Sequence, residues 1–345
     1  MPLGSEKATL LGAAGGSSTI KMYGFGGNNS GPDPVYNNTE VKIYEESTDS
    51  WALGAVLAIG RGGNNNNLGA AWLSDAAYRN GKFWAAYGFA GSTPSAEPSN
   101  QYYNSVTNTS AAIGAAPGPS RSIVGYWSMH DKFFCGSGMK YTPNYWSTYN
   151  VVQSQAYSND AWTTHGTGPQ NSYTSFASAS FSSNTNLAYM FMGRNIPVSG
   201  NMPNWGTDIY NVYSYSQSAD SWTGLTNSPN NWKPQGNHWI DNINEKCYVW
   251  KAGGGPDFMV WTKSSDSWTN LTSSAPVCRS NPSMAANDVV GIGYYGGGEA
   301  QAPESPTGNT FASGKYTFAT DAWSTITSET VGRIRSLGNF GGITQ

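Results

Sequence analysis

A short aromatic pattern recurs along the chain and limits what it can fold into. In its clearest copy, Trp261 is followed by a polar turn and then by Asp266, Ser267 and Trp268. Three further copies keep the same seven-residue spacing between the two aromatic residues: Tyr44 with Trp51, Tyr215 with Trp222, and Tyr316 with Trp323. A pattern that returns at intervals predicts a fold built from similar units, each packed on its neighbours.

Two weaker copies complete the series. Trp162 follows Asp160 and Ala161 with its tyrosine displaced to Tyr157, and Tyr103 precedes a turn in which Ser110 stands where the Trp is expected. The six copies end at positions 51, 110, 162, 222, 268 and 323, so the spacing is 46 to 60 residues. A period of about 50 residues is typical of β-propellers, in which each repeat forms one small sheet.

A second element recurs upstream of each copy, as a short strand of alternating or continuously apolar residues. These strands are residues 19–27, 81–88, 131–136, 186–193, 245–250 and 289–296. An arginine opens another strand before most of them, namely Arg61, Arg121, Arg279 and Arg333, and Gln170 and Asn231 stand near the matching place in the other two repeats. Two strands before each turn and one after it, with the arginine strand, give about four strands per repeat.

This order of Arg, strand, Gly-Gly, strand with Tyr, polar turn and Trp resembles the kelch repeat over residues 19–343. The double glycine is intact at Gly26-Gly27, Gly253-Gly254 and Gly296-Gly297. The resemblance implies an all-β, six-bladed kelch-like β-propeller with four antiparallel strands per blade. It also places each Trp beside the aromatic residue seven positions earlier, on adjacent strands that pack between blades.

The two ends of the chain predict how the first blade is completed. Residues 333–343 have the pattern of a first strand with no second strand after it, and residues 19–27 that of a second strand with no typical first. We therefore expect a propeller domain over residues 19–345 whose first blade is closed by the C-terminal strand. Residues 1–18 form an N-terminal arm in this hypothesis; in the alternative, residues 8–16 supply the missing strand.

Composition excludes several classes of protein. Charged residues make up 11% and the net charge is −3, which leaves no basic footprint for nucleic acid. No disulfide framework, metal-ligand spacing, signal peptide or membrane-spanning run is visible, so we expect no cofactor, no metal and no membrane. The few charges, the Asn, Ser, Thr and Gly surface and the small-residue N-terminus resemble bacteriophage virion structural proteins.

Function in a repeat scaffold usually lies in its long loops. In an up-and-down blade the connections after the second and fourth strands emerge on one face. Here the connections after the second strand are long and rich in Pro and Asn, at residues 28–38, 92–101, 140–146, 194–206 and 299–309, and the connections after the fourth strand carry the arginines. The candidate binding residues on this face are Arg61, Arg121, Arg279, Arg333, Tyr36, Tyr102, Tyr145, Trp146 and Trp205. The arginines have a structural alternative, because an arginine at the start of a kelch strand often bonds backbone carbonyls.

The sequence contains no catalytic motif, and the three histidines His130, His165 and His238 fall in different repeats. We therefore expect a non-catalytic structural or recognition protein of a virion, assembled in the host cytoplasm. Its expected partners are other virion proteins, met through the N-terminal arm, and a host surface glycan. The alternative is a glycan-acting enzyme of the sialidase or epimerase type, since paired carboxylates meet in space and not in sequence.

Overall fold

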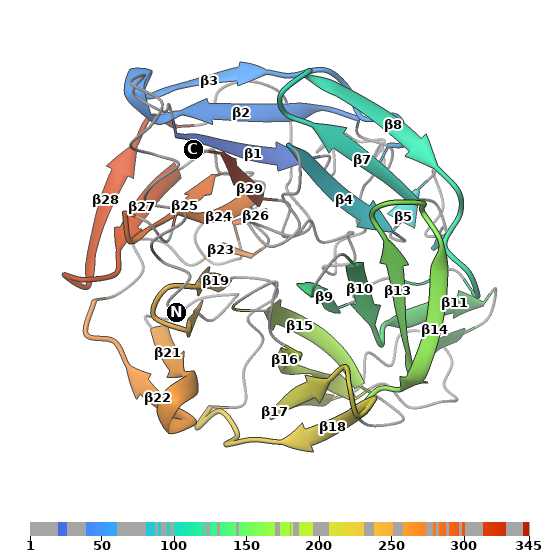
Figure 1. Cartoon of the computed structure of the whole chain (residues 1–345). Helices are drawn as coiled ribbons and strands as arrows, with labels where there is room; N and C mark the ends of the chain where they lie inside the picture. The colour runs from blue at the N-terminus through green and yellow to red at the C-terminus, as the bar shows by residue number, and fades with distance from the viewer. Residues whose placement is uncertain are drawn as a thin grey trace.

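The structure is a computed structural model. It describes residues 20–25, 39–60, 81–86, 89–90, 95–96, 100–119, 121, 125–129, 132–142, 145–169, 173–179, 181, 186–195, 207–230, 238–250, 258–273, 279–280, 283–287, 290–296, 299–300, 313–328 and 341–344. Within these residues the chain is all-β, with six small antiparallel sheets of three or four strands, consistent with propeller blades. Figure 1 shows the sheets following one another around a common centre.

The sheets are numbered in chain order and their strands from the centre outward. The first is β29 (Gly341–Thr344), β1 (Lys21–Phe25), β2 (Val41–Glu45) and β3 (Ser50–Leu53); the second is β4 (Lys82–Ala86), β7 (Asn100–Asn104) and β8 (Thr109–Ile113); the third is β9 (Gly125–Met129), β10 (Lys132–Gly136), β13 (Val151–Ala156) and β14 (Trp162–Thr167). The fourth is β15 (Tyr173–Ala179), β16 (Leu187–Asn195), β17 (Thr207–Ser216) and β18 (Ser221–Gly224); the fifth is β19 (His238–Asp241), β20 (Lys246–Trp250), β21 (Phe258–Thr262) and β22 (Ser267–Asn270); the sixth is β24 (Ser283–Asn287), β25 (Ile292–Gly296), β27 (Ser313–Thr317) and β28 (Ala322–Ile326).

All six strands expected from the second recurring element are present, as β1, β4, β10, β16, β20 and β25. The expected contribution of the C-terminal end to the first sheet is also found, because β29 pairs antiparallel with β1. Residues 1–18 and 333–340 lie outside the described residues, and so does any first strand of the second sheet.

The predicted pairing of the repeat aromatics is confirmed in four copies. Tyr44 lies directly opposite Trp51, and the same register holds for Tyr215 with Trp222, Trp261 with Trp268, and Tyr316 with Trp323. In the copy without a Trp, Tyr103 lies opposite Ser110. In the third sheet Gln155 takes the place opposite Trp162, and the displaced Tyr157 packs against the core instead.

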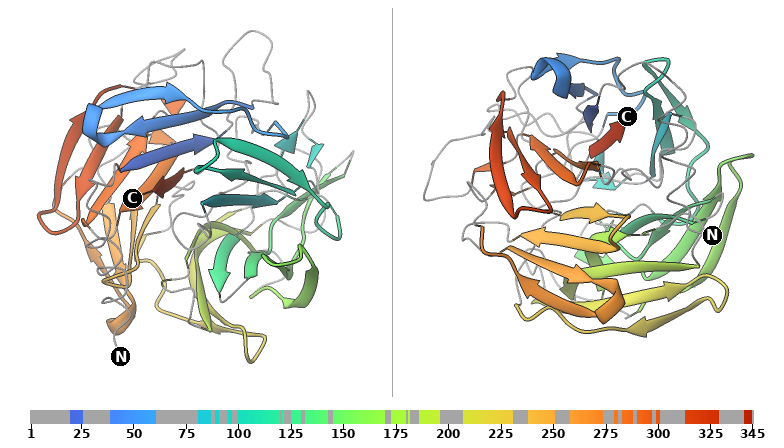
Figure 2. Two further views of the ribbon diagram at one scale, coloured as in Figure 1. Left: turned by 45° about the horizontal axis from the view of Figure 1, so that its top comes forward. Right: turned by 60° about the vertical axis from the view of Figure 1, so that its left-hand side comes forward.

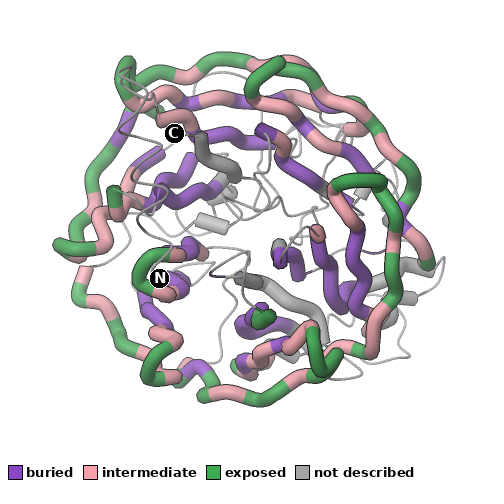
Figure 3. The backbone as a smooth tube through the Cα atoms, in the orientation of Figure 1, coloured by how far each residue is buried: buried purple, intermediate pink, exposed green. Residues whose placement is uncertain are grey.

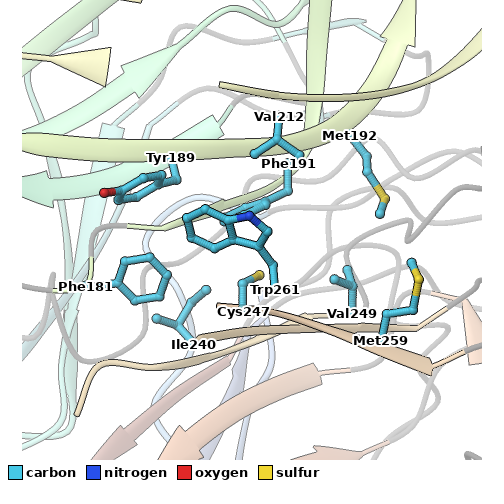
Figure 4. Packing of buried hydrophobic residues seen from close by; sticks show 10 residues of the cluster. All are labelled: Phe181, Tyr189, Phe191, Met192, Val212, Ile240, Cys247, Val249, Met259 and Trp261. Atoms are coloured by element: carbon cyan, nitrogen blue, oxygen red, sulfur yellow. The ribbon is translucent and has the colours of Figure 1, made fainter. Parts of the chain in front are cut away.

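The core consists of clusters between neighbouring sheets. Successive residues of a strand point to opposite faces, so Tyr23 and Phe25 pack toward the second sheet while Met22 packs toward the sixth. Each of the six clusters found among the described residues draws on two neighbouring sheets, and one of them joins the sixth sheet to the first through Ala285, Tyr294, Met22 and Tyr44. Figure 4 shows the cluster between the fourth and fifth sheets, centred on Trp261.

Burial falls from the centre outward. The inner strands are mostly buried, as the five residues of β20 show, whereas the outermost strands such as β18 and β22 are mostly half-buried or exposed (Figure 3). The outermost strands lie at the perimeter of the molecule in Figure 1 and in the views of Figure 2. An inner strand such as β1 has large apolar side chains on both of its faces. Both faces can be buried only when a neighbouring sheet lies on each side of the strand.

Three of the expected long loops contain strands. Residues 92–101 include β6 (Ser95–Ala96), which pairs with β5 (Phe89–Ala90), and residues 140–146 belong to the hairpin of β11 (Met139–Thr142) and β12 (Tyr145–Thr148). β26 (Glu299–Ala300) pairs with β23 (Arg279–Ser280). Strands were not expected at these places, because segments of two to four residues are too short for periodicity to mark them in the sequence.

Candidate functional site

The four candidate arginines do not form one group in the described part of the chain. Arg61 and Arg333 lie outside the described residues, and Arg279 is in β23, opposite Ala300. Arg121 precedes β9 and its side chain is 0% exposed. Their proposed contact with a ligand stays a prediction.

Arg121 is held inside the third sheet by backbone carbonyls. Its Nη1 donates to the carbonyl oxygens of Ser137 at 2.9 Å and Val151 at 2.8 Å, and its Nη2 donates to the side chain of Gln153. The guanidinium also lies 5.1 Å from the ring centre of Tyr149. These bonds tie the second and third strands of the sheet together, which is the structural role that an arginine at this position can have.

The candidate aromatic residues are in different settings. Tyr36 and Trp205 lie outside the described residues, and Tyr145 and Trp146 belong to β12. Tyr102 was expected to be a loop residue, but it lies in β7, opposite Trp84 with 5.3 Å between the ring centres. Lys82 Nζ covers the ring of Tyr102 at 4.2 Å. Tyr102 is therefore a half-buried residue of the second sheet.

The additional strands all lie at one end of the sheets. The hairpin β5–β6 interrupts the connection from the second to the third strand of its sheet, as do β11–β12 in the third sheet and β26 in the sixth. β23 enters at the same end, just before the first strand of the sixth sheet. β6 and β11 contact each other, so the insertions of these two neighbouring sheets are adjacent.

The opposite end carries the short turns, and we call it the turn face. It is defined by the turns between third and fourth strands, at residues 46–49, 105–108, 157–161, 217–220, 263–266 and 318–321, and by the turns between first and second strands, which lie at the same end of an antiparallel sheet. Residues 241–245 form one of these short turns, as expected from the sequence.

Each third-to-fourth turn contains an Asp or Asn with left-handed backbone geometry. The six residues are Asp49, Asn108, Asp160, Asp220, Asp266 and Asp321, with φ between 43° and 55°. Asp and Asn adopt this conformation more readily than other residues with a side chain. The turn therefore explains the residue type, and the side-chain contacts explain its further use.

In five of the six turns this Asp or Asn links two sheets. Within its own sheet it accepts a bond from the aromatic residue five positions earlier, as from Tyr215 to Asp220 at 2.7 Å, or from Trp261 Nε1 to Asp266 at 3.1 Å. From the preceding sheet it accepts a backbone N–H at or after the end of the fourth strand. These bonds are Ala55 to Asn108 at 2.8 Å, Gly166 to Asp220 at 2.7 Å, Thr226 to Asp266 at 2.9 Å, Thr272 to Asp321 at 2.9 Å and Thr327 to Asp49 at 2.9 Å.

The repeat Trp strengthens the same contact. Trp51 Nε1 donates to the carbonyl of Thr327 at 2.9 Å, Trp222 Nε1 to Thr167 at 3.0 Å, and Trp268 Nε1 to Thr226 at 3.1 Å. We call the bonds of the Asp or Asn to the preceding sheet, together with the Trp bond where one is formed, a latch. Sequence analysis assigned the Trp to packing and placed the Asp after the turn, in the strand of the Trp. It missed the latch because the partners lie 40 to 55 residues away, or almost a whole chain away for Asp49 and Trp51.

The latch lowers the pKa of two of its carboxylates, Asp49 and Asp321. Hydrogen bonds from the backbone of Thr327 and from Tyr44 hold the pKa of Asp49 below its usual value. Burial alone raises the pKa of Asp321, but bonds from Ser273, Thr272 and Tyr316 outweigh burial and leave this pKa lowered. Both carboxylates are consequently ionised well below neutral pH.

Two other settings bring reactive groups together. Ser154 Oγ lies 2.7 Å from His165 Nε2, and burial lowers the pKa of His165, but Ser154 is 1% exposed and cannot reach a substrate from outside. The buried Lys42 has its pKa lowered to about 7 by burial, against the opposing charge of Glu40. Both Ser154 and Lys42 are buried, so neither has the open access that a nucleophile requires.

In the described residues no group of three or more His, Cys, Asp or Glu side chains could hold a metal ion. The helices of the same residues include none with the length and apolar character needed to cross a membrane. No family model matches the chain, and no curated protein is similar to it in sequence.

Proposed function

We propose that the six sheets are the blades of a kelch-like β-propeller over residues 19–345, closed through β29, with residues 1–18 as an N-terminal arm. Two observations support this architecture. Each sheet shares a core cluster with the next, including the sixth with the first. Latches repeat at five of these contacts, and one of them joins Thr327 near the C-terminus to Asp49 near the N-terminus.

We further propose that the protein is a non-catalytic structural and recognition component of a phage virion surface, such as a capsid decoration, head fibre or tail protein. The observation that carries this function is the division of roles between the two ends of the sheets. At the turn face the repeat carboxylates and indoles are used to join sheets, whereas extra strands accumulate at the opposite end. A rigid scaffold that varies at one end is suited to binding.

The composition of the outermost strands supports a role in a virion particle. The outermost strands β18 and β22 read Ser-Trp-Thr-Gly and Ser-Trp-Thr-Asn, so their solvent-facing side is polar and uncharged. In this proposal the arm contacts other virion proteins, and the inserted strands contact a neighbouring protein or a host glycan. Tyr145 and Trp146 in β12 are the residues on which we place the glycan contact, because aromatic rings pack against sugar faces.

The arm and the inserted strands are tested separately. Deletion of residues 2–16 is expected to leave the protein in the unassembled fraction of a phage lysate while its circular dichroism spectrum is unchanged. On a glycan array, the Tyr145→Ser/Trp146→Ser variant is expected to lose binding that the wild type and a Val56→Ser control retain. Turnover of a fluorogenic sialoside or galactoside by the wild type would overturn the non-catalytic assignment.

A further inference from the structure

A histidine occupies a repeat position that most of the other sheets fill with an aliphatic residue. His165 is the third residue after the repeat Trp162, in the outermost strand of the third sheet. The matching residues of the other five repeats are Gly54, Ile113, Leu225, Leu271 and Ile326. The four aliphatic ones pack against the cluster that their sheet shares with the next sheet. An aliphatic side chain meets the packing requirement at this place, so the titratable ring in the third sheet requires a separate explanation.

A β-bulge holds the His165 ring at the contact with the fourth sheet. The register of β13 and β14 shifts where His165 and Gly166 together oppose one residue of β13, and bulges of this kind re-aim side chains. The ring stacks on Phe134 with 5.4 Å between the ring centres, and Phe134 belongs to the cluster shared by the third and fourth sheets. Gly166 donates its N–H to the latch residue Asp220 at 2.7 Å. The histidine is therefore the immediate neighbour of a latch bond.

The hydrogen bond between Ser154 and His165 requires a neutral ring. Ser154 Oγ lies 2.7 Å from His165 Nε2, and Ser154 is 1% exposed. Within the described residues this is the one hydrogen bond of the Ser154 side chain, so we assign its hydroxyl proton to the Nε2 lone pair. Once Nε2 is protonated, the ring can only donate, and the buried hydroxyl loses the acceptor that it has in this part of the chain.

The surroundings of the ring act on its charge in both directions. Burial lowers the pKa of His165, the Asp220 carboxylate opposes burial, and the charge of Lys132 acts in the same direction as burial. The face of the Phe134 ring also favours a cation. Because the pKa of His165 is lowered on balance, the ring is neutral at neutral pH, which is the state that Ser154 requires.

We propose that the Ser154–His165 pair is an acid-sensitive joint, at which proton uptake by His165 weakens the contact between the third and fourth sheets. The proton removes the acceptor of a buried hydroxyl and places a cation beside Gly166, where it competes for the Asp220 carboxylate. A histidine of the unfolded chain titrates near about 6.5. The contact therefore loses stability as the pH falls below about 6.5, and the loss is complete below the pKa of the folded protein. This inference needs only the described sheets and does not depend on the proposed virion function.

The test is amide hydrogen exchange of the full chain, measured by mass spectrometry at about pH 7.5 and pH 5.5 and corrected for the intrinsic pH dependence of exchange. In the wild type, protection of the segment that contains Gly166 is expected to fall by about 2- to 10-fold in acid, which corresponds to one hydrogen bond. His165→Leu restores the residue type of the other repeats, and its protection is expected to be the same at the two pH values. His165→Gln, whose amide oxygen can accept from Ser154 at either pH, is a second variant with the same expectation.

Two controls separate this joint from a general effect of acid. The segment that contains Thr272 reports on a latch without a histidine and is expected to keep its protection. His238→Gln changes a histidine of the fifth sheet and is expected to behave like the wild type, with tryptophan fluorescence as the check that every variant is folded. Equal losses of protection in the wild type and His165→Leu would overturn the proposal. So would equal changes in the segments of Gly166 and Thr272, or better protection of Gly166 in acid.

Discussion

The latch at the fifth-to-sixth sheet contact gives the sharpest test of how the repeats hold together. The Asp321 carboxylate accepts five hydrogen bonds: from Tyr316 Oη at 2.8 Å, from Thr272 N and Oγ1 at 2.9 and 2.7 Å, from Ser273 N at 3.2 Å, and from Ser273 Oγ. Asp321→Asn keeps the shape and tolerates the φ of 48°. It removes the charge and places an N–H₂ group where donors already converge.

The magnitude follows from these bonds. A hydrogen bond to a charged group is worth about 1.5–3 kcal/mol in mutational series, and an amide retains part of the set because hydroxyl groups can rotate to accept. The carboxylate is also half-exposed, which reduces the charge contribution by solvent screening. We therefore expect Asp321→Asn to lower the free energy of unfolding by about 1–3 kcal/mol, measured by urea denaturation followed by tryptophan fluorescence.

Asp160→Asn is the control for this measurement. Asp160 has the same position in its repeat and a φ of 55°, but its carboxylate accepts no hydrogen bond from the described residues. We expect a change within about 0.5 kcal/mol, typical of an exposed substitution. Equal losses in the two variants, or no loss in Asp321→Asn, would refute the argument that the latch carboxylate stabilises the sheet-to-sheet contact.

The direction of the pH dependence is also fixed. The pKa of Asp321 is lower in the folded protein than in the unfolded chain, where an Asp titrates near about 3.9. The carboxylate therefore contributes its full stabilisation of the fold above about pH 3.9, and this stabilisation is lost as the pH falls through the pKa of the folded protein. Wild-type stability should therefore fall more steeply in acid than that of Asp321→Asn. The free energy of unfolding of both proteins is measured between about pH 5 and pH 2, where carboxylates titrate. If it falls equally in the two proteins, the stabilising role of the Asp321 carboxylate is wrong.

Three further outcomes are expected in the same denaturation assay. Trp222→Phe should cost about 1 kcal/mol more than Trp323→Phe, because Trp222 Nε1 donates to Thr167 whereas Trp323 Nε1 has no hydrogen-bond partner among the described residues; equal costs would remove the indole from the latch. Gly136→Ala should cost about 1–3 kcal/mol, because its Cβ would lie 2.6 Å from Trp127, and Gly224→Ala, with nothing within 4 Å, should be close to neutral. Arg121→Met should cost about 3 kcal/mol or more, because the buried carbonyls of Ser137 and Val151 and the side chain of Gln153 lose the guanidinium as donor, although the Val151 carbonyl retains the N–H of Ser137. Arg121→Lys should not restore the loss if the forked guanidinium is required.

The repeat, its period and the opposite placement of the two aromatic residues could be predicted because they are local. Tyr44 and Trp51 are close in sequence and in one hairpin, so spacing alone gives their register. The latch could not be predicted in this way, since Trp51 and Thr327 are separated by almost the whole chain. A turn aspartate gives no sign in the sequence of whether its second oxygen faces solvent or another sheet.

The candidate site was predicted less well than the fold. Tyr102 was expected in a loop because residues 92–101 are rich in Pro, Ser and Asn, but β7 already begins at Asn100. Boundaries between polar loops and polar strands depend on pairing with distant strands, which local propensity does not encode. From the sequence, Arg121 could be a binding residue on the long-loop face or a structural residue that bonds backbone carbonyls. Its burial and its bonds to two carbonyls, which only the structure gives, favour the structural role.

The second repeat shows why the copies can diverge so far in sequence. Asn108 replaces the aspartate, and its single carbonyl oxygen accepts from both Ala55 N and the hydroxyl of Tyr103. Ser110 replaces the Trp, and its hydroxyl accepts from Ala58 N of the preceding sheet while it donates to the carbonyl of Tyr102. What each position must supply is a left-handed turn and hydrogen bonds to the preceding sheet, and more than one residue type meets that requirement. A repeat defined by these contacts can therefore keep its geometry after its sequence signature is lost.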